Sequence, residues 1–288
     1  MTRRRLIFFC ALVLVAAGVV ALWPSGPKEP VFQGRKLSEW IRIAGLYPTN
    51  SQTEHARVAI NAIGTNAIPY LLSEFSARES RLAPKLAEWV SRKTGFDFGF
   101  DEGNPRRGMA VVGLSFLGTN AAPALPALAT NLTDEENCVG AAWVMGECGE
   151  MALPYLLTAL TSTNLLNWYV VIHALGSLTA QTDAAIPPLV QLTQHTNHGF
   201  RALAAANLSK ARSRMDLVIP ALGRLLSDSH PSVQLMATDS LIRMRERAKG
   251  AIPDLLVMLQ DTNLTRASWA SNALYKIDPS ALPRAAAP

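Results

Sequence analysis

The stretch that decides the fold is Ala251-Ile252-Pro253-Asp254-Leu255-Leu256, because its pattern of isoleucine, proline and leucine returns at a fixed interval. The Ile-Pro pair occurs at Ile186-Pro187, Ile219-Pro220 and Ile252-Pro253, so the pattern has a constant 33-residue period. A leucine stands two positions after each of these prolines. A fixed period of this size predicts a stacked-repeat protein, in which each unit buries its apolar face against its neighbours.

The residues upstream of each proline predict what one repeat contains. Alanines at 204, 237 and 270 each stand four positions before the leucines at 208, 241 and 274. Small residues at that helical spacing allow close approach of neighbouring helices. The proline then falls in the first turn of a second helix, where its missing N–H costs nothing. We therefore predict an all-α fold, a right-handed α-solenoid of antiparallel helix pairs.

The same pattern extends toward the N-terminus and sets the expected domain limits. Gly64-Thr65-Asn66-Ala67 reappears as Gly118-Thr119-Asn120-Ala121, and both sequences are typical of the turn inside a repeat. We expect about six repeats, the first from His55 to Phe75, and a terminal cap helix at Thr265–Ile277. The predicted solenoid spans 32–277, and 278–288 is predicted to be a flexible tail.

One segment, 76–107, interrupts the repeats. It contains Phe96, Phe98 and Phe100 among glycines, and ends with Arg106 and Arg107. One hypothesis is an insertion at 81–107 whose aromatic and basic side chains form a ligand site. The alternative is a degenerate repeat whose aromatic residues fill a gap in the core.

The N-terminus has the features of a membrane-targeting segment. Leu6 to Trp23 is an uncharged, apolar run preceded by three arginines, and a proline-rich linker at 24–31 follows it. The run is long enough to span a bilayer, so we predict a signal anchor at 1–23 with its N-terminus in the cytoplasm. Cleavage near Ala16-Ala17-Gly18 is the alternative. Either outcome predicts a repeat domain on the exported side, membrane-anchored or secreted.

The basic composition does not indicate a nucleic-acid partner. The chain has a net charge of +5, but Arg3, Arg4, Arg5, Lys28 and Glu29 contribute +3 of it, which leaves +2 for the rest. The excess charge therefore belongs with the targeting segment rather than with a polyanion-binding surface.

The phrase Ala251-Ile252-Pro253-Asp254-Leu255 through Leu259 resembles a HEAT repeat of the short, phycobilisome-lyase-like type. Phe32 to Trp40 is similar to the lead-in of exported bacterial HEAT-repeat proteins. The resemblance implies the solenoid fold over about residues 55–277 but says little about activity. The family includes chromophore lyases, an activity that the predicted export disfavours. An arginine common early in one helix of these repeats is present as Arg201 but replaced by Gln234 one period later.

No catalytic, cofactor-binding or metal-binding constellation emerges from the sequence. It lacks a phosphate-binding glycine loop, a nucleophile elbow and a zinc-helix motif. His195 and His198 are the one close histidine pair, and with no neighbouring thiolate or carboxylate we interpret them as loop residues. Cys138 and Cys148 are interpreted as small buried hydrophobes, with a disulfide as the less favoured alternative.

The remaining candidate is the surface of the proline-led helices, which we expect on the concave side. The side chains predicted to face away from the core there are Gln191, Gln194, Arg224, Ser227, Asp254, Val257 and Gln260. This polar, weakly charged set favours a protein or extended peptide as the partner over nucleic acid, although an ordinary solvated helix face gives the same pattern. We predict a non-enzymatic, membrane-tethered interaction scaffold. The alternative is an enzyme accessory or ligand-binding protein that uses the 81–107 insertion.

Overall fold

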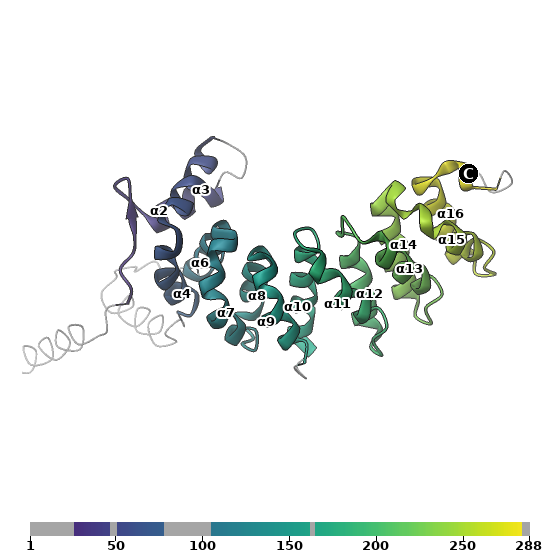
Figure 1. Cartoon of the computed structure of the whole chain (residues 1–288), viewed down its shortest axis with the longest axis horizontal. Helices are drawn as coiled ribbons and strands as arrows, with labels where there is room; N and C mark the ends of the chain where they lie inside the picture. The colour runs from purple at the N-terminus through teal and green to yellow at the C-terminus, as the bar shows by residue number, and fades with distance from the viewer. Residues whose placement is uncertain (1–25, 47–50, 78–104, 162–164, 284–288) are drawn as a thin grey trace, which may run out of the picture.

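The computed structural model describes residues 26–46, 51–77, 105–161 and 165–283. Helices stacked side by side form a curved arc in Figure 1, with the N-terminal helices at one end and the C-terminal helices at the other. The successive pairs are α3 (Ser51–Ile63) with α4 (Ile68–Phe75), α6 (Pro105–Leu117) with α7 (Leu125–Asn131), α8 (Cys138–Glu147) with α9 (Leu153–Ala159), α10 (Leu165–Leu178) with α11 (Ile186–Leu192), α12 (His198–Leu208) with α13 (Met215–Leu225), and α14 (Pro231–Met244) with α15 (Ile252–Leu259). A single helix, α16 (Leu264–Ile277), follows the last pair. The predicted α-solenoid is confirmed.

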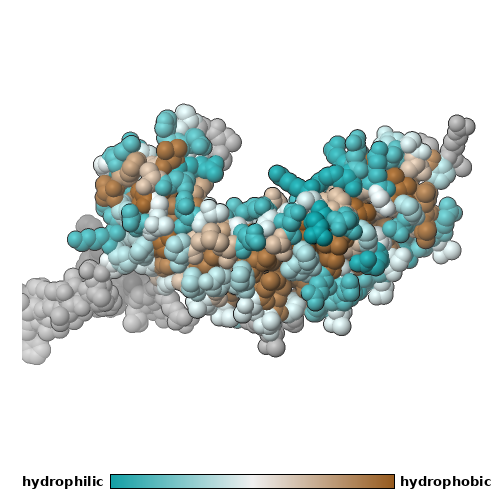
Figure 2. All heavy atoms as spheres, in the orientation of Figure 1, coloured by the Kyte–Doolittle hydropathy of each residue, from teal (hydrophilic) through white to brown (hydrophobic). Residues whose placement is uncertain are grey.

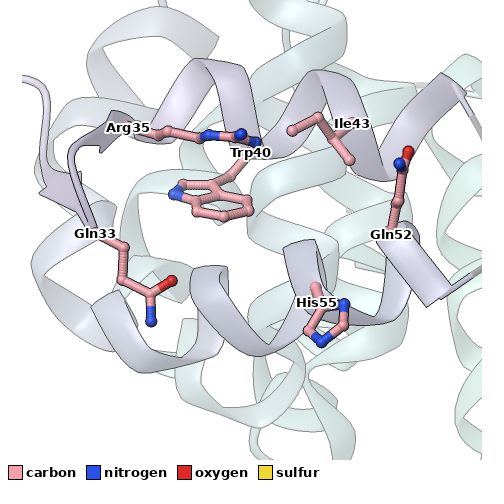
Figure 3. A pocket seen from close by; sticks show the side chains of 6 residues that line it. All are labelled: Gln33, Arg35, Trp40, Ile43, Gln52 and His55. Carbon is pink, nitrogen blue, oxygen red and sulfur yellow. The ribbon is translucent and has the colours of Figure 1, made fainter.

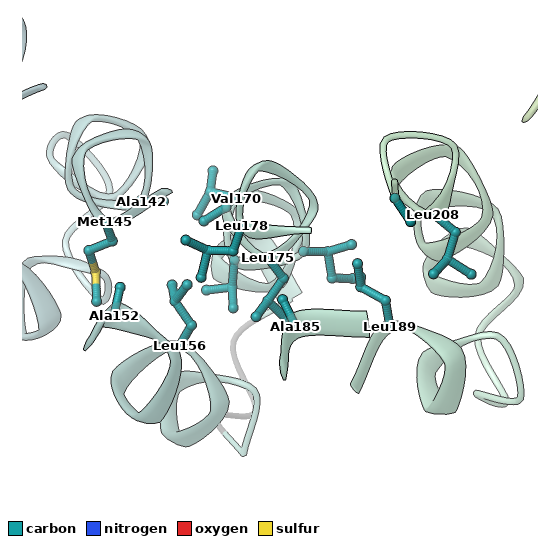
Figure 4. Close-up of a cluster of buried hydrophobic side chains, with 14 of the residues drawn as sticks. Ala142, Met145, Ala152, Leu156, Val170, Leu175, Leu178, Ala185, Leu189 and Leu208 are labelled. Atoms are coloured by element: carbon teal, nitrogen blue, oxygen red, sulfur yellow. The ribbon is translucent and has the colours of Figure 1, made fainter. Parts of the chain in front are cut away.

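Apolar side chains from both helices of each pair, and from neighbouring pairs, form one continuous core. Met145, Leu156, Leu175, Leu189 and Leu208 are fully buried and meet along the middle of the stack in Figure 4. Burying a leucine side chain contributes ~1.5–3 kcal/mol. The alanines at 204, 237 and 270 are also fully buried, as their spacing predicts. The repeat period therefore records the contacts that hold each repeat to the next.

Proline opens most of the second helices but not all of them. It lies at the first or second position of α4, α7, α9, α11 and α15. In α13, however, Pro220 lies inside the helix, because α13 already begins at Met215. The N-cap of this helix is Arg214, which has a left-handed backbone conformation with φ 52°. The prediction that every repeat proline lies in the first helical turn is therefore wrong for Pro220.

The turn inside four of the repeats begins at a residue with positive φ. Gly64, Gly118 and Gly149 have φ values of 59°, 53° and 70° and open the 3-10 helices η1 (Gly64–Ala67), η2 (Gly118–Ala124) and η3 (Gly149–Ala152). Glycine is the residue that adopts this conformation without a steric cost. Arg245 opens η5 (Arg245–Ala251) with φ 53°, so an arginine occupies the place that glycine holds in the earlier repeats.

A short hairpin and one helix cover the N-terminal end of the stack. The strands β1 (Val31–Phe32) and β2 (Arg35–Lys36) pair antiparallel around Gln33 and Gly34, which both have positive φ. Helix α2 (Leu37–Leu46) then packs on α3 and α6. The carboxylate of Glu29 accepts a hydrogen bond of 2.7 Å from the backbone N–H of Ser38, in the first turn of this helix.

The C-terminal end is also ordered beyond the last long helix. Asp278 caps η6 (Pro279–Ala281) and lies 3.3 Å from the Lys249 ammonium group, while Leu282 packs on the core. Residues 278–283 therefore form part of the folded stack, because Asp278 and Leu282 supply the polar and apolar contacts that fix this turn. The rest of the predicted tail, 284–288, lies outside the described residues.

Among the described residues, one run is long and apolar enough to cross a membrane by length and composition. It extends from Arg106 to Asn131 with a mean hydropathy of 1.4. This run comprises α6, η2 and α7, which pack within the solenoid. The predicted anchor Leu6–Trp23 lies outside the described residues.

Candidate interaction surface

The arc has an inner and an outer side, and the two helices of a repeat lie on different sides. In Figure 1 the arc opens upward, and α8, α14 and α16 lie above α9, α13 and α15. We call the row in which each helix packs on the next (α6, α8, α10, α12, α14 and α16) the inner helices, and the other row (α7, α9, α11, α13 and α15) the outer helices. The concave side therefore belongs to the inner helices, contrary to the expectation from the sequence. Helix order alone does not determine which side of the stack curves inward.

The structure places the predicted partner-binding residues along the outer side. Gln191, Gln194, Arg224, Ser227, Asp254, Val257 and Gln260 are all exposed, on α11, α13, α15 and the turns that follow them. Gln191 and Gln194 line a hollow of about 720 Å³ together with Trp168 and His195. The other five lie on other repeats and do not line that hollow. The predicted set is thus an exposed strip, and only its first two members share a concavity.

The predicted insertion site is described only at its C-terminal edge. Phe96, Phe98 and Phe100 lie outside the described residues, and Arg106 and Arg107 belong to the first turn of α6. Arg106 donates two hydrogen bonds, of 2.5 and 2.6 Å, to the carboxylate of Glu74 on α4. Arg107 donates one of 3.0 Å to the carboxylate of Glu136, just before α8. Both arginines therefore join neighbouring repeats. Their contacts give no support to the hypothesis of a ligand site.

The loop histidines have structural partners within the repeats. The Nδ1 atom of His195 accepts a hydrogen bond of 3.0 Å from the Asn197 backbone N–H. Asp228 and Asp261 make the same contact at the equivalent positions of the next two repeats, with the N–H groups of His230 and Asn263. His195 thus takes the place of a loop aspartate. The ring of His198 stacks on that of His230 at 3.7 Å rather than on His195. The described residues contain no group of three or more metal-ligating side chains.

A second column of loop residues caps the inner helices. Asn197, His230 and Asn263 stand at the same position of successive repeats, and each accepts a backbone N–H from the first turn of α12, α14 and α16. Such caps contribute ~1 kcal/mol each. Their spacing is visible in the sequence, and it would have identified the histidine at 230 as part of the repeat.

The inner side carries an apolar groove between α8 and α10. Its volume is about 250 Å³, and its lining includes Val139, Trp143, Tyr169, His173 and Ser177. Val139, Trp143 and Tyr169 are 62%, 64% and 54% exposed. Large apolar side chains grouped in this way on a solenoid face indicate a contact surface for another molecule.

One cation is held at the edge of this groove. Lys210, at the end of α12, donates a hydrogen bond of 2.9 Å from its ammonium group to Oδ1 of the buried Asn207. Partial burial lowers the pKa of Lys210. Burial and, second, the charge of Lys210 also lower the pKa of His173, so that histidine is neutral at pH 7. Glu147 is the acidic group in the lining. The groove is thus apolar with a fixed positive charge at one side.

Glycine at one position makes this arrangement sterically feasible. A β-carbon on Gly176 of α10 would lie 2.0 Å from Oδ1 of Asn207 on α12. Because the Asn207 side chain also donates a hydrogen bond of 2.9 Å to the Leu203 carbonyl oxygen, its amide has little freedom to move away. Gly176 therefore permits the close helix contact that holds Asn207 and, through it, Lys210.

The helix pairs, the loop caps and the stacked inner helices together define the architecture. The chain is a HEAT-like α-solenoid. No family model matches its sequence, and no curated protein sequence is similar to it.

Several solved repeat structures resemble this solenoid at low sequence identity. The complex of CpcE and CpcF of phycocyanin lyase from Nostoc has 17% identity and a TM-score of 0.36, with 91% of this chain and 96% of that chain covered. A designed armadillo repeat protein in complex with the peptide (KR)4 has 18% identity and a TM-score of 0.43, with coverage of 73% and 99%. The karyopherin Kap121p bound to the C-terminus of Cdc14p has 16% identity and a TM-score of 0.45, and this solenoid covers 29% of its length.

A third hollow lies at the N-terminal end of the solenoid. Its volume is about 450 Å³, and Figure 3 shows Gln33, Arg35, Trp40, Ile43, Gln52 and His55 around it. The Arg35 guanidinium group lies 5.2 Å from the ring centroid of Trp40, and the Trp40 indole N–H donates a hydrogen bond of 3.1 Å to the Phe32 carbonyl oxygen. These contacts fix the hairpin against α2 and so close the end of the stack.

The two cysteines of α8 and its C-cap are structural. Cys138 and Cys148 are both buried and free of a disulfide. Burial raises the pKa of Cys148 to about 12, so the thiolate does not form at neutral pH. Both therefore behave as the small buried hydrophobes that the sequence favoured.

Sequence reasoning missed the groove residues themselves. Trp143, Tyr169 and Lys210 were not among the predicted site residues. Trp143 lies in the repeat before the strict period begins, and Tyr169 lies on the first helix of the repeat that contains Ile186-Pro187. The sequence feature that could have revealed them is a large apolar residue at a helix position that faces away from the core.

Proposed function

We propose that this protein is a non-enzymatic scaffold that binds a protein or an extended peptide on its inner side. The observation that carries the proposal is the groove between α8 and α10, where Val139, Trp143 and Tyr169 are more than half exposed. Aromatic side chains that are exposed in the free protein and grouped around a concavity are typical anchors of protein interfaces. A curved solenoid offers further helices beside such an anchor, so one partner contacts several repeats.

The chemistry of the groove supports binding rather than catalysis. His173 is neutral at pH 7, and its neighbours in the lining are mostly apolar. Glu147 and Lys210 are single charges of opposite sign in that lining. This composition provides apolar contact area and two points of charge recognition. The sequence likewise offers no nucleophile activated by a neighbouring base.

We propose further that Leu6–Trp23 tethers the scaffold to a membrane with the repeats on the exported side. The three arginines before this run and its uncharged length support that orientation. A single cysteine at the exposed position 257 (Val257→Cys) tests it, because the two cysteines of the folded part are buried. A membrane-impermeant maleimide should label this variant, but not the unchanged chain, in intact spheroplasts. Labelling only after lysis would place the repeats inside.

The binding proposal is tested by photo-crosslinking of the full-length chain in the cells that produce it. A benzophenone amino acid replaces Tyr169 on the inner side or, as the matched control, Val257 on the outer side, which is 72% exposed. We expect one discrete crosslinked protein from position 169, lost when Trp143→Ala is added, and none from position 257. Absence of any product at 169, or the same product at both positions, contradicts an inner-side scaffold.

A further inference from the structure

Basic residues recur with the repeat period at the ends of the last three inner helices. Lys210 follows α12, while Arg243 and Lys276 lie in the last turns of α14 and α16 at the equivalent positions of the next two repeats. All three are exposed. We call them the basic row. Because α12 packs on α14, and α14 on α16, the row follows the stack from one inner helix to the next.

The basic row is confined to one half of the solenoid. The preceding inner helices have Ser177, Glu147 and Phe116 at the corresponding position near their C-terminal ends. Figure 2 shows a strongly hydrophilic region on the upper side of the half that contains α12 and α14. Cations near helix C-termini are favoured by the helix dipole, but that effect acts on every helix. It does not explain why only the last three carry them.

Arg245 adds a second, independent observation. It has φ 53° and ψ −130° at the position where earlier repeats have a glycine with positive φ. A residue with a β-carbon is strained in this region of backbone space. Arg245 is exposed and belongs to the turn that directly follows Arg243. An arginine at a site that glycine would fill without strain indicates a use for its charge.

The basic row is continuous with the apolar groove, because Lys210 belongs to both. Its ammonium group is held by Asn207, and its side chain lines the same groove as Tyr169 and His173. From there, Arg243 and Lys276 continue away from the groove on the next two inner helices. The acidic groups of this region are Asp239, which lies 2.7 Å from Arg243, Asp278, which lies 3.3 Å from Lys249, and Glu246. Since Arg212, Arg245 and Arg247 also stand in these turns, the positive charge predominates.

We propose that the groove and the basic row together bind an extended acidic segment of another protein, with one apolar side chain in the groove and carboxylates against Lys210, Arg243 and Lys276. Neighbouring helices lie ~8–10 Å apart, and a chain in the extended polyproline II conformation advances ~3.1 Å per residue and presents every third side chain on the same side. The segment therefore carries acidic residues at roughly every third position after its apolar anchor. Glu147, on the other side of the groove, sets the direction by repelling carboxylates there.

This occupant is favoured over nucleic acid by the make-up of the surface. The anchor is an apolar groove whose Glu147 would oppose a phosphate backbone, and the basic row has one charge per repeat rather than a dense patch. The inference deepens the proposed function and rests on it, because it names the partner chemistry for the same inner side.

The test uses the full-length chain in mild detergent and fluorescein-labelled peptides of equal length, read by fluorescence polarisation. The probe has one phenylalanine followed by glutamate at every third position, with serine elsewhere. The comparison probes replace phenylalanine by serine, replace the glutamates by lysines, or are a single-stranded oligothymidine. We expect the probe to bind at least tenfold more tightly than each comparison.

Variants of the chain then locate the binding. The triple change Lys210→Gln, Arg243→Gln and Lys276→Gln should weaken the probe about tenfold or more, whereas Arg224→Gln on the outer helix α13 should leave it unchanged. No binding of the probe, equal binding of oligothymidine, or insensitivity to the triple change overturns the inference. In each of those cases, a crosslinked product at position 169 would still support the scaffold function. It would show that the partner is a protein without such an acidic segment.

Discussion

Arg201 on α12 holds Asp228, one repeat later, through two parallel hydrogen bonds. Its Nε and Nη2 atoms donate hydrogen bonds of 2.7 Å to the two carboxylate oxygens. Its Nη1 atom donates to the carbonyl oxygens of His195 and Thr196 in the preceding loop. The side chains of Arg201 and Asp228 are only 14% and 9% exposed. One guanidinium group therefore joins two successive loops, and Gln234 continues the contact by donating to the Asp228 carbonyl oxygen.

Removing one partner of this pair should destabilise the solenoid. We expect Arg201→Ala to lower the free energy of unfolding by about 2–4 kcal/mol, because it leaves the largely buried Asp228 carboxylate without its cation. Denaturation in urea measures the change. Arg224→Ala, an exposed arginine on the next helix, serves as the control and should cost less than about 0.5 kcal/mol. Equal effects of the two variants would contradict a structural role for the pair.

Acid should weaken the same contact. The hydrogen bonds from Arg201 lower the pKa of Asp228 below its ordinary value of 3.8. A carboxyl group with a lowered folded-state pKa contributes stability that is present above its unfolded-state pKa and lost as pH falls through the folded-state pKa. We therefore expect the Asp228→Asn variant to lose less stability than the native chain between pH 5 and pH 2, roughly the range set by the ordinary carboxyl pKa. Parallel thermal melts at several pH values measure it, and identical slopes would contradict the assignment.

The architecture was predictable from the sequence because each repeat buries the same residue types at equivalent positions. Leu208, Leu241 and Leu274 are buried at matching positions, so a fixed interval in the sequence becomes a fixed contact in the stack. Arg245 and Pro220 were not predictable in this way. Both depart locally from the pattern: Arg245 opens a turn with positive φ where earlier repeats have glycine, and Pro220 lies inside a helix that begins earlier, at Met215.

The interaction surface was less accessible from the sequence for a geometric reason. The strip that includes Val257 was correctly predicted to be exposed, but which row of helices faces inward depends on small rotations between successive repeats. Trp143 was missed because exposure cannot be read from an apolar residue in an apolar helix. Its position on the inner side follows from the packing of α8 against α10, which buries Val144 and leaves Trp143 outward.

A β-carbon at position 176 should disrupt the support of the groove. We expect Gly176→Ala to destabilise the chain by about 1–3 kcal/mol, since the new methyl group would overlap the Asn207 side chain. Gly108→Ala on α6 is the matched control, because a β-carbon there meets nothing within 4 Å. That change should stabilise by about 0.5–1 kcal/mol. Unfolding curves of both variants measure the difference, and adding Asn207→Ala should relieve part of the cost at 176.

Trp143 should contribute to binding and not to stability. Its side chain is 64% exposed, so Trp143→Ala should change the free energy of unfolding by less than about 0.5 kcal/mol. The same change should weaken a partner held in the groove by at least about 1.4 kcal/mol, or tenfold. Polarisation titration and chemical denaturation of one preparation separate the two effects. A loss of affinity matched by a loss of stability would show that Trp143 is structural.

Arg245 should contribute to binding while it lowers the stability of the fold. Arg245→Gly removes the β-carbon from a residue at φ 53° and ψ −130° and should stabilise the chain by about 1 kcal/mol. The reciprocal change, Gly149→Ala, places a β-carbon at φ 70° in an earlier repeat and should destabilise by a similar amount. If the arginine is retained for its charge, Arg245→Gly also weakens the acidic probe while it raises the melting temperature. Arg245→Lys, which keeps the charge and the strained backbone, should restore most of that affinity without the gain in stability. A glycine variant that is neither more stable nor weaker in binding would show that the turn tolerates arginine without cost and that its charge has no partner.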